Sequence, residues 1–239
     1  MITEEQNLAL ITVGTEAAKN PAWAHYANYC FEREKGRRKT ALLEMDKFLT
    51  AAEKWVLEEK INFLHFIFPF FEQIPDASYG PFPQPLSKQL VEPALISWCD
   101  TNPADSRPFR WYGRYYKSVE HLEKAITLNP ADDLARSYLI EEWMTLIDFS
   151  LHHFPECFIG NPADSVAQGE RVQMQIEQLI SPALKKSWTE KLAYSLHLIQ
   201  TYINWEASGH PNLELWASEN NINIDGAGNA VYYFNTKTT

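Results

Sequence analysis

The tetrapeptide Asn-Pro-Ala-Asp occurs three times in this chain, and it restricts the fold more than any other feature of the sequence. The copies begin at Asn102, Asn129 and Asn161, which are 27 and 32 residues apart. Asn can cap the free N–H groups of a helix start, Pro fits the first helical position, and Asp favours the positive end of the helix dipole. Because Pro also ends the preceding helix, each copy predicts the end of one helix and the start of the next.

Apolar periodicity predicts the helices that these marks separate. Between the second and third copies, apolar residues recur every three to five positions, which indicates one long helix that ends at Pro155 and buries this stripe. The stripe consists of Leu134, Tyr138, Trp143, Leu146, Ile147, Leu151 and Phe154. A last helix is expected to begin at Ser181-Pro182 and to end at Ser208-Gly209.

The N-terminal half is expected to hold a helix pair at 3–19 and 21–35 and a long helix at 40–68 that breaks near Asn62. The segment 75–93 contains five of the fourteen prolines and is expected to be a rigid loop. The predicted divisions are an N-terminal helical half at 1–74, the Pro-rich loop at 75–93, a repeat half at 94–217 and a C-terminal segment at 218–239. One domain over the whole chain is the alternative.

The C-terminal segment has a different pattern. Apolar residues alternate on both sides of a Gly-rich turn at 225–229, with Ile222 and Ile224 before it and Val231 and Tyr233 after it. This pattern predicts a small β-hairpin or an ordered tail. The run 221–226 imitates the start of a calcium loop, but Tyr232 stands where such a loop needs a bidentate Glu.

Three segments resemble the tetratricopeptide repeat (TPR). Leu122 to Pro130 looks like a second repeat helix that ends at its characteristic proline, and Trp23 to Ala27 and Trp111 to Tyr115 look like first-helix segments. The resemblance implies an all-α fold of antiparallel helix pairs stacked as a degenerate solenoid, with a protein-binding role. The family period is 34 residues, so spacings of 27 and 32 imply imperfect repeats. The run 152–162 also resembles uncharacterised bacterial repeat-like proteins.

Charge indicates which partners the chain can accept. It has 21 Lys and Arg against 31 Asp and Glu, a formal net charge of −10. This field repels nucleic acid and anionic membranes, so neither is expected as a partner. A protein partner with a neutral or basic surface is favoured. The basic run 36–39 is expected to be a solvated corner between helices.

Cysteines and hydropathy indicate a cytoplasmic protein. Cys30, Cys99 and Cys157 are odd in number and form no CxxC pair, so neither a disulfide framework nor a thiolate zinc site is expected. The first residues lack a cationic segment followed by an apolar run. The longest apolar stretch, 61–71, is too short to span a bilayer. No cofactor is expected.

The strongest candidate binding surface is the run 107–116, where arginines alternate with aromatic rings. These residue types supply the rigid contact area and bidentate hydrogen bonds of binding hot spots. The candidate residues are Arg107, Arg110, Trp111, Arg114 and Tyr115. The alternative, which we favour, places the rings in a helix interface and the arginines at its rim.

A second candidate is a metal site at the end of the predicted long helix. Asp148 and His152 are four residues apart, as are His153 and Cys157, and these groups can ligate zinc. Pro155 interrupts this run, and no HExxH motif, phosphate loop or nucleophile elbow occurs. The chain is therefore expected to be no enzyme but a protein-interaction module of the immunity or adaptor type. The alternatives are a metal-dependent hydrolase and a small-molecule sensor with a cavity beneath the Pro-rich loop.

Overall fold

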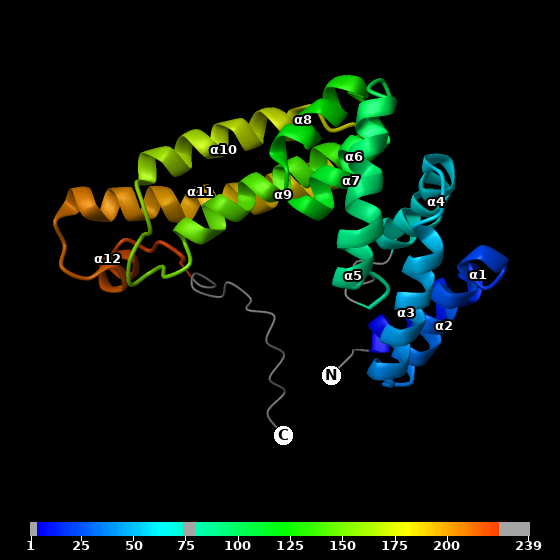
Figure 1. The fold of residues 1–239 in the computed structure, drawn as a ribbon. Helices are drawn as coiled ribbons and strands as arrows, with labels where there is room; N and C mark the ends of the chain where they lie inside the picture. Colours follow the sequence, from blue (N-terminus) through cyan, green and yellow to red (C-terminus); the bar gives the residue numbers. More distant parts are fainter. Residues whose placement is uncertain (1–3, 74–79, 225–239) are drawn as a thin grey trace. The chain divides into compact units, whose positions relative to one another are not determined.

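The computed structural model describes residues 4–73 and 80–224, and within these ranges the chain is helical, with no β-strand (Figure 1). This confirms the all-α prediction. The chain divides into two compact units, Met1–Tyr115 and Tyr116–Thr239, called unit 1 and unit 2 below. The division lies near the end of one helix, whereas the sequence-based division lay at 75–93.

Unit 1 contains helices that pack mainly on their neighbours in the chain. In order they are α1 (Glu4–Ala17), the 3-10 turn η1 (Pro21–Trp23), α2 (Ala24–Glu34), α3 (Arg38–Ala52), α4 (Leu57–Gln73), α5 (Gln84–Leu86), the π-turn η3 (Ser87–Val91), α6 (Glu92–Thr101) and α7 (Ser106–Tyr116). α2 packs between α1 and α3, and α4 packs on α6.

Aromatic rings fill the centre of unit 1. The rings of Tyr26, Phe48 and Phe63 lie 5.0 to 5.4 Å apart and are fully buried. The hydroxyls of Tyr26 and Tyr29 donate to the carbonyls of Pro81 and Gly80, at 2.8 and 2.7 Å. Burial raises the pKa of both phenols. These bonds hold the segment that leads into α5 against α2.

The predicted helix at 40–68 is two helices, and its break lies at Glu53–Val56 and not near Asn62. The Glu59 carboxylate accepts a hydrogen bond from the Val56 N–H at 2.9 Å, which caps the start of α4. Trp55 folds inward at this corner and packs edge-on against Phe48. α4 then continues through Pro69 to Gln73.

The Pro-rich segment is also more helical than predicted, because a helix begins at Gln84. Pro85 and Pro93 occupy first-turn positions of α5 and α6, where a missing N–H is tolerated. Between them η3 bonds the Glu92 N–H to the Ser87 carbonyl, a π-type turn. This turn shifts the hydrogen-bond register just before Pro93, so the chain remains helical across the proline.

Unit 2 contains five helices in its described part: α8 (Val119–Leu128), α9 (Asp133–Ser150), α10 (Pro162–Glu177), α11 (Pro182–Ser208) and α12 (Leu213–Glu219). α9, α10 and α11 lie alongside one another (Figure 1), and each helix packs on the next in the chain. The Asp133 carboxylate accepts from the N–H groups of Ile180 and Ser181, at 2.9 and 2.7 Å. These bonds join the start of α9 to the start of α11. Helix α11 is the last helix predicted from the sequence, from Ser181-Pro182 to Ser208.

The Asn-Pro-Ala-Asp marks do separate helices, but their residues act in two ways. Asn161 caps α10 as predicted, accepting from the Ala163 N–H at 3.1 Å. At the second copy Asp132 is the cap of α9, accepting from the Ala135 N–H at 3.0 Å, and Asn129 ends α8. At the first copy α7 begins after Asp105, which accepts from the Arg107 N–H at 3.0 Å. The predicted capping role of Asn is therefore wrong at two copies, where the turn delays the helix until after the Asp.

The predicted C-terminal hairpin lies mainly outside the described residues, at 225–239. Within them, Ile222 and Ile224 belong to no strand. They follow α12 as an irregular segment, and Ile224 packs against the core of unit 2.

Candidate functional site

The predicted Arg and aromatic cluster on α7 is a packing surface of unit 1. Trp111 is 2% exposed, and its indole N–H donates to Glu72 Oε1 of α4 at 2.6 Å. Arg110 pairs with the same oxygen at 3.0 Å, and both charged side chains are mostly buried. This arrangement matches the alternative in which the rings form an interface, because Arg110 and Trp111 hold α7 to α4.

The rest of the cluster lies closer to solvent. Arg107 is about half exposed and pairs with Asp105 at 2.7 Å while its guanidinium lies over the Trp98 ring. The Tyr115 ring packs on Phe68 at 5.0 Å, and Arg114 is half-buried. Of the five candidate residues, Arg107 is the only one that the structure exposes.

The candidate metal residues are not brought together. The Asp148 carboxylate faces Lys191 of α11, 3.2 Å away. The rings of His152 and His153 contact each other at 4.8 Å, and Cys157 lies exposed in the following loop. Among the described residues no group of three His, Cys, Asp or Glu side chains is placed to hold a metal ion.

The two buried cysteines are poor nucleophiles. Burial raises the pKa of the Cys30 thiol well above its usual value and that of Cys99 to about 11. A thiol with a raised pKa is protonated at neutral pH, and the thiolate is the reactive form. Cys30 and Cys99 therefore contribute packing to unit 1.

Helix α9 exposes part of its predicted apolar stripe: burial is wrong for Leu134 and Leu146, whereas Ile147 of the same stripe is buried. The buried face consists of Ala135, Arg136, Ser137, Leu139, Ile140, Met144 and Ile147. Leu134 and Leu146 of the predicted inward stripe are 39% and 59% exposed, and Phe149 is 62% exposed. Leu146 and Phe149 are three residues apart and so lie side by side on the exposed face. We call Leu134, Leu146 and Phe149, with the polar residues between them, the α9 face.

The charges around the α9 face are mostly negative. α9 contains one cationic residue, Arg136, which is buried and donates to the Gln175 side chain and the Pro130 carbonyl. Glu142 and Asp148 flank Leu146 and Phe149 in sequence and pair with Lys117 and Lys191 of neighbouring segments. The face therefore presents apolar side chains bordered by two carboxylates, each of which is paired with a Lys.

Unit 2 carries most of the net charge. It holds 16 of the 31 Asp and Glu residues but 8 of the 21 Lys and Arg residues, so −8 of the net −10 falls here. The stretches 137–170 and 192–224 contain nine carboxylates and no Lys or Arg. A surface built from these stretches favours cationic groups and repels anions.

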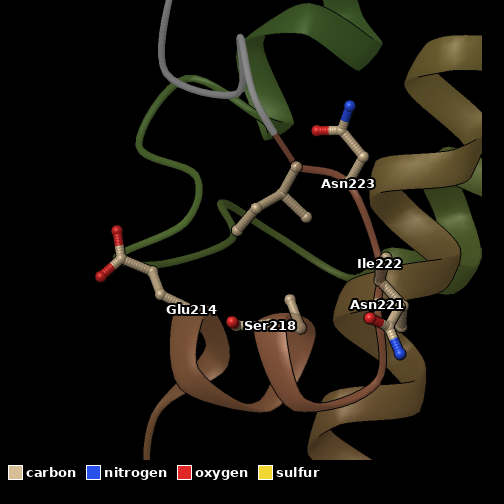
Figure 2. Close-up of a pocket in the computed structure, with 7 residues that line it drawn as sticks. Glu214, Ser218, Asn221, Ile222 and Asn223 are labelled. Atoms are coloured by element: carbon tan, nitrogen blue, oxygen red, sulfur yellow. The ribbon is translucent and has the colours of Figure 1, made fainter.

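A second candidate site is a cleft of about 500 Å³ at the end of α12 (Figure 2). Its wall is a Schellman turn: the Ile222 N–H bonds to the Ala217 carbonyl at 2.8 Å, and the Asn221 N–H bonds to the Ser218 carbonyl. Asn221 has φ of 56°, the left-handed conformation that this turn requires. The turn sends the chain back beside α12 and so creates the cleft.

One carboxylate and several polar groups line this cleft. Glu214 and Ser218 lie one helical turn apart on α12, and Asn221 and Asn223 come from the returning segment (Figure 2). The remaining lining residues, Ala217, Ile222 and Ile224, are apolar. Sequence analysis had noted 221–226 only as an incomplete calcium loop and missed the cleft.

None of the helices in the described ranges combines the length and the apolarity needed to cross a membrane.

Comparison with known proteins gives no match: no protein-family model, no curated protein and no solved structure is similar to this chain. The site residues must therefore be interpreted from their own geometry.

Proposed function

We propose that the chain is a protein-binding module and that the α9 face binds an apolar segment of a partner protein. The observation that carries the proposal is the pair Leu146 and Phe149, exposed side by side near the end of α9, with Leu134 exposed near the start of the same helix, while other apolar residues of α9 fill the core. A surface helix normally exposes polar residues on the side away from the core. Clustered exposed apolar side chains are typical of interaction sites.

Electrostatics supports a basic partner. The α9 face lies in a unit with net charge −8, within a stretch from 137 to 170 that has no Lys or Arg. A partner segment with apolar residues flanked by Lys or Arg complements both properties, because opposite potentials speed association and disfavour wrong partners. An immunity protein that neutralises a basic effector, or an adaptor, has these properties without catalysis.

The proposal includes a degenerate TPR-like arrangement for α8 to α11 in a cytoplasmic protein. In its support, α8, α9, α10 and α11 pack in chain order and α9 also contacts α11. Stacked repeats of this kind create extended concave binding surfaces. With α8 as a second helix, as its resemblance to the repeat implies, α9 is a first helix.

Site-specific photocrosslinking tests the proposal. A benzophenone amino acid is placed at Phe149 in the full chain, expressed in its native cells, and at Met174 of α10 as a control. Met174 is 58% exposed, close to the exposure of Phe149. We expect a discrete crosslinked species from position 149 that is absent from position 174. No species at position 149, or the same species from both positions, contradicts the proposal.

A further inference from the structure

The cleft beside α12 has the shape and polarity for a ligand with one polar end and one apolar stem. Ala217, Ile222 and Ile224 supply apolar surface, whereas Glu214 and Ser218 supply oxygen atoms on one side of α12 (Figure 2). Ligand pockets typically combine an apolar lining with a few polar groups that orient the ligand.

Charge selects a cation for the polar end. The Glu214 side chain forms no ion pair or hydrogen bond with another described residue, and among the described residues it is the one charged group that lines the cleft. The stretch 192–224, which forms the cleft and the helix behind it, contains no Lys or Arg. An anion entering the cleft meets a carboxylate with no compensating cation, whereas a cation completes an ion pair.

The backbone holds the cleft in place. The Schellman turn fixes 220–222 on α12. The carbonyl of Asn223 is bonded to His197 Nε2 of α11 at 2.9 Å, which ties the returning segment to the longest helix of unit 2. The Asn212 side chain caps α12 by accepting from the Leu215 N–H at 2.8 Å. The backbone that carries Glu214, Ser218 and Asn221 is therefore ordered before a ligand arrives, which reduces the entropy cost of binding.

A metal ion fits these groups poorly. Calcium takes six to eight oxygen ligands and usually several carboxylates, whereas the cleft offers one carboxylate among amide and hydroxyl groups. An organic cation needs fewer ligands. A guanidinium has five donors in a planar fork, which suits one carboxylate with neighbouring amide and hydroxyl oxygens.

We propose that the cleft lined by Glu214, Ser218 and Asn221 binds the cationic end of an alkyl-guanidinium or alkyl-ammonium group. Glu214 pairs with the cation, Ser218 accepts a hydrogen bond from it, and Ile222 and Ile224 contact the alkyl stem. The source of the cation is an Arg or Lys side chain of a protein or a free polyamine. This inference is independent of the α9 face, because it concerns other residues and is tested with small probes.

Amide NMR of the full chain tests the inference with N-acetyl-arginine amide as the probe. The neutral isostere N-acetyl-citrulline amide is the matched probe, and putrescine represents free polyamines. We expect saturable shifts of the Ser218, Asn221 and Ile222 amides with the arginine probe and none with citrulline. A stronger response to arginine supports a protein side chain as the source, and a stronger response to putrescine supports a polyamine.

Two variants of α12 separate a specific site from general acidity. Glu214→Gln removes the carboxylate that lines the cleft, and Glu219→Gln removes an exposed carboxylate of the same helix outside it. We expect Glu214→Gln to weaken binding about fivefold, the upper range for an exposed ion pair, and Glu219→Gln to weaken it less than about twofold. Equal weakening by both variants, equal response to citrulline, or response to calcium chloride alone overturns the inference.

Discussion

The indole N–H of Trp111 donates to Glu72 Oε1 at 2.6 Å, and the same carboxylate pairs with Arg110 at 3.0 Å. Glu72 thus connects α4 to two residues of α7, at a position where both charged side chains are less than 15% exposed. We expect Glu72→Ala to lower the free energy of unfolding by about 3 kcal/mol, because it removes the carboxylate that pairs with the mostly buried Arg110 and accepts from the buried Trp111 indole.

Urea unfolding followed by circular dichroism measures this effect. Glu72→Gln is expected to cost less than Glu72→Ala, since its amide oxygen still accepts from Trp111. Glu16→Ala, which removes an exposed pair with Lys19, is expected to change stability by less than about 0.5 kcal/mol. A cost for Glu72→Ala no larger than that of Glu16→Ala contradicts the packing role of α7.

The two modes of the Asn-Pro-Ala-Asp mark predict opposite patterns of alanine sensitivity. Asp132→Ala removes the cap of α9, and Asn161→Ala removes the cap of α10. Each is expected to cost about 1 kcal/mol. The partners Asn129→Ala and Asp164→Ala are expected to cost no more than about half as much. Thermal or urea unfolding of the four variants measures these costs. If Asn is the more costly residue to replace at both copies, or if Asp is, the prediction is contradicted.

His65 predicts a loss of stability on acidification. Burial against Trp98 and Trp111 and the nearby Arg107 lower the pKa of His65 below its usual 6.5, although Asp105 opposes the shift. The unfolded chain therefore takes up a proton at this histidine more readily than the folded chain, so stability decreases as the pH falls below about 6.5. His65→Gln is expected to lose less stability than wild type between pH 7 and pH 5.

Comparing urea midpoints at the two pH values checks this prediction. His121 also has a pKa lowered by burial, so part of the pH dependence is expected to persist in His65→Gln. An identical loss of stability in His65→Gln and wild type shows that His65 does not contribute.

Asn221 predicts how the wall of the cleft responds to substitution. Its φ of 56° costs a residue with a Cβ about 1 to 2 kcal/mol unless it is Asn or Asp. We expect Asn221→Ala to destabilise the chain by about 1 kcal/mol and Asn221→Gly to leave stability nearly unchanged. Equal unfolding midpoints for the Ala and Gly variants mean that the turn does not require the left-handed conformation.

Local signals in the sequence identified helix ends but not always the residue that caps them. Ser181-Pro182 and Ser208-Gly209 bracket α11 as predicted, because a cap, a first-turn proline and a left-handed Gly209 act within a few residues. The break at 53–56 was missed because it depends on Trp55 reaching the aromatic core. Such a contact joins residues of different helices and leaves no local pattern.

The candidate sites were harder to predict for a related reason. α9 has apolar residues around most of its circumference, so periodicity does not tell which face is buried, and Phe149 was missed. For α7, composition alone does not distinguish a binding cluster from an interface, and the Glu72 contact that decides the matter lies 39 residues away. One feature of the sequence did indicate the turn beside the cleft. Asn221 is a residue type that adopts the left-handed conformation after the end of a helix, and the apolar Ile222 follows it.

The central claim is that the α9 face binds a partner protein, and one double variant tests it most directly. Leu146→Glu/Phe149→Glu adds two charges to the face, and Met174→Glu adds one to an equally exposed position of α10. All three substitutions are at exposed positions, so we expect stability within about 0.5 kcal/mol of wild type. The amount of specific partner that each tagged chain recovers from its native cells is then quantified. The account predicts at least a tenfold loss for the double variant and none for Met174→Glu, whereas undiminished recovery by the folded double variant contradicts it.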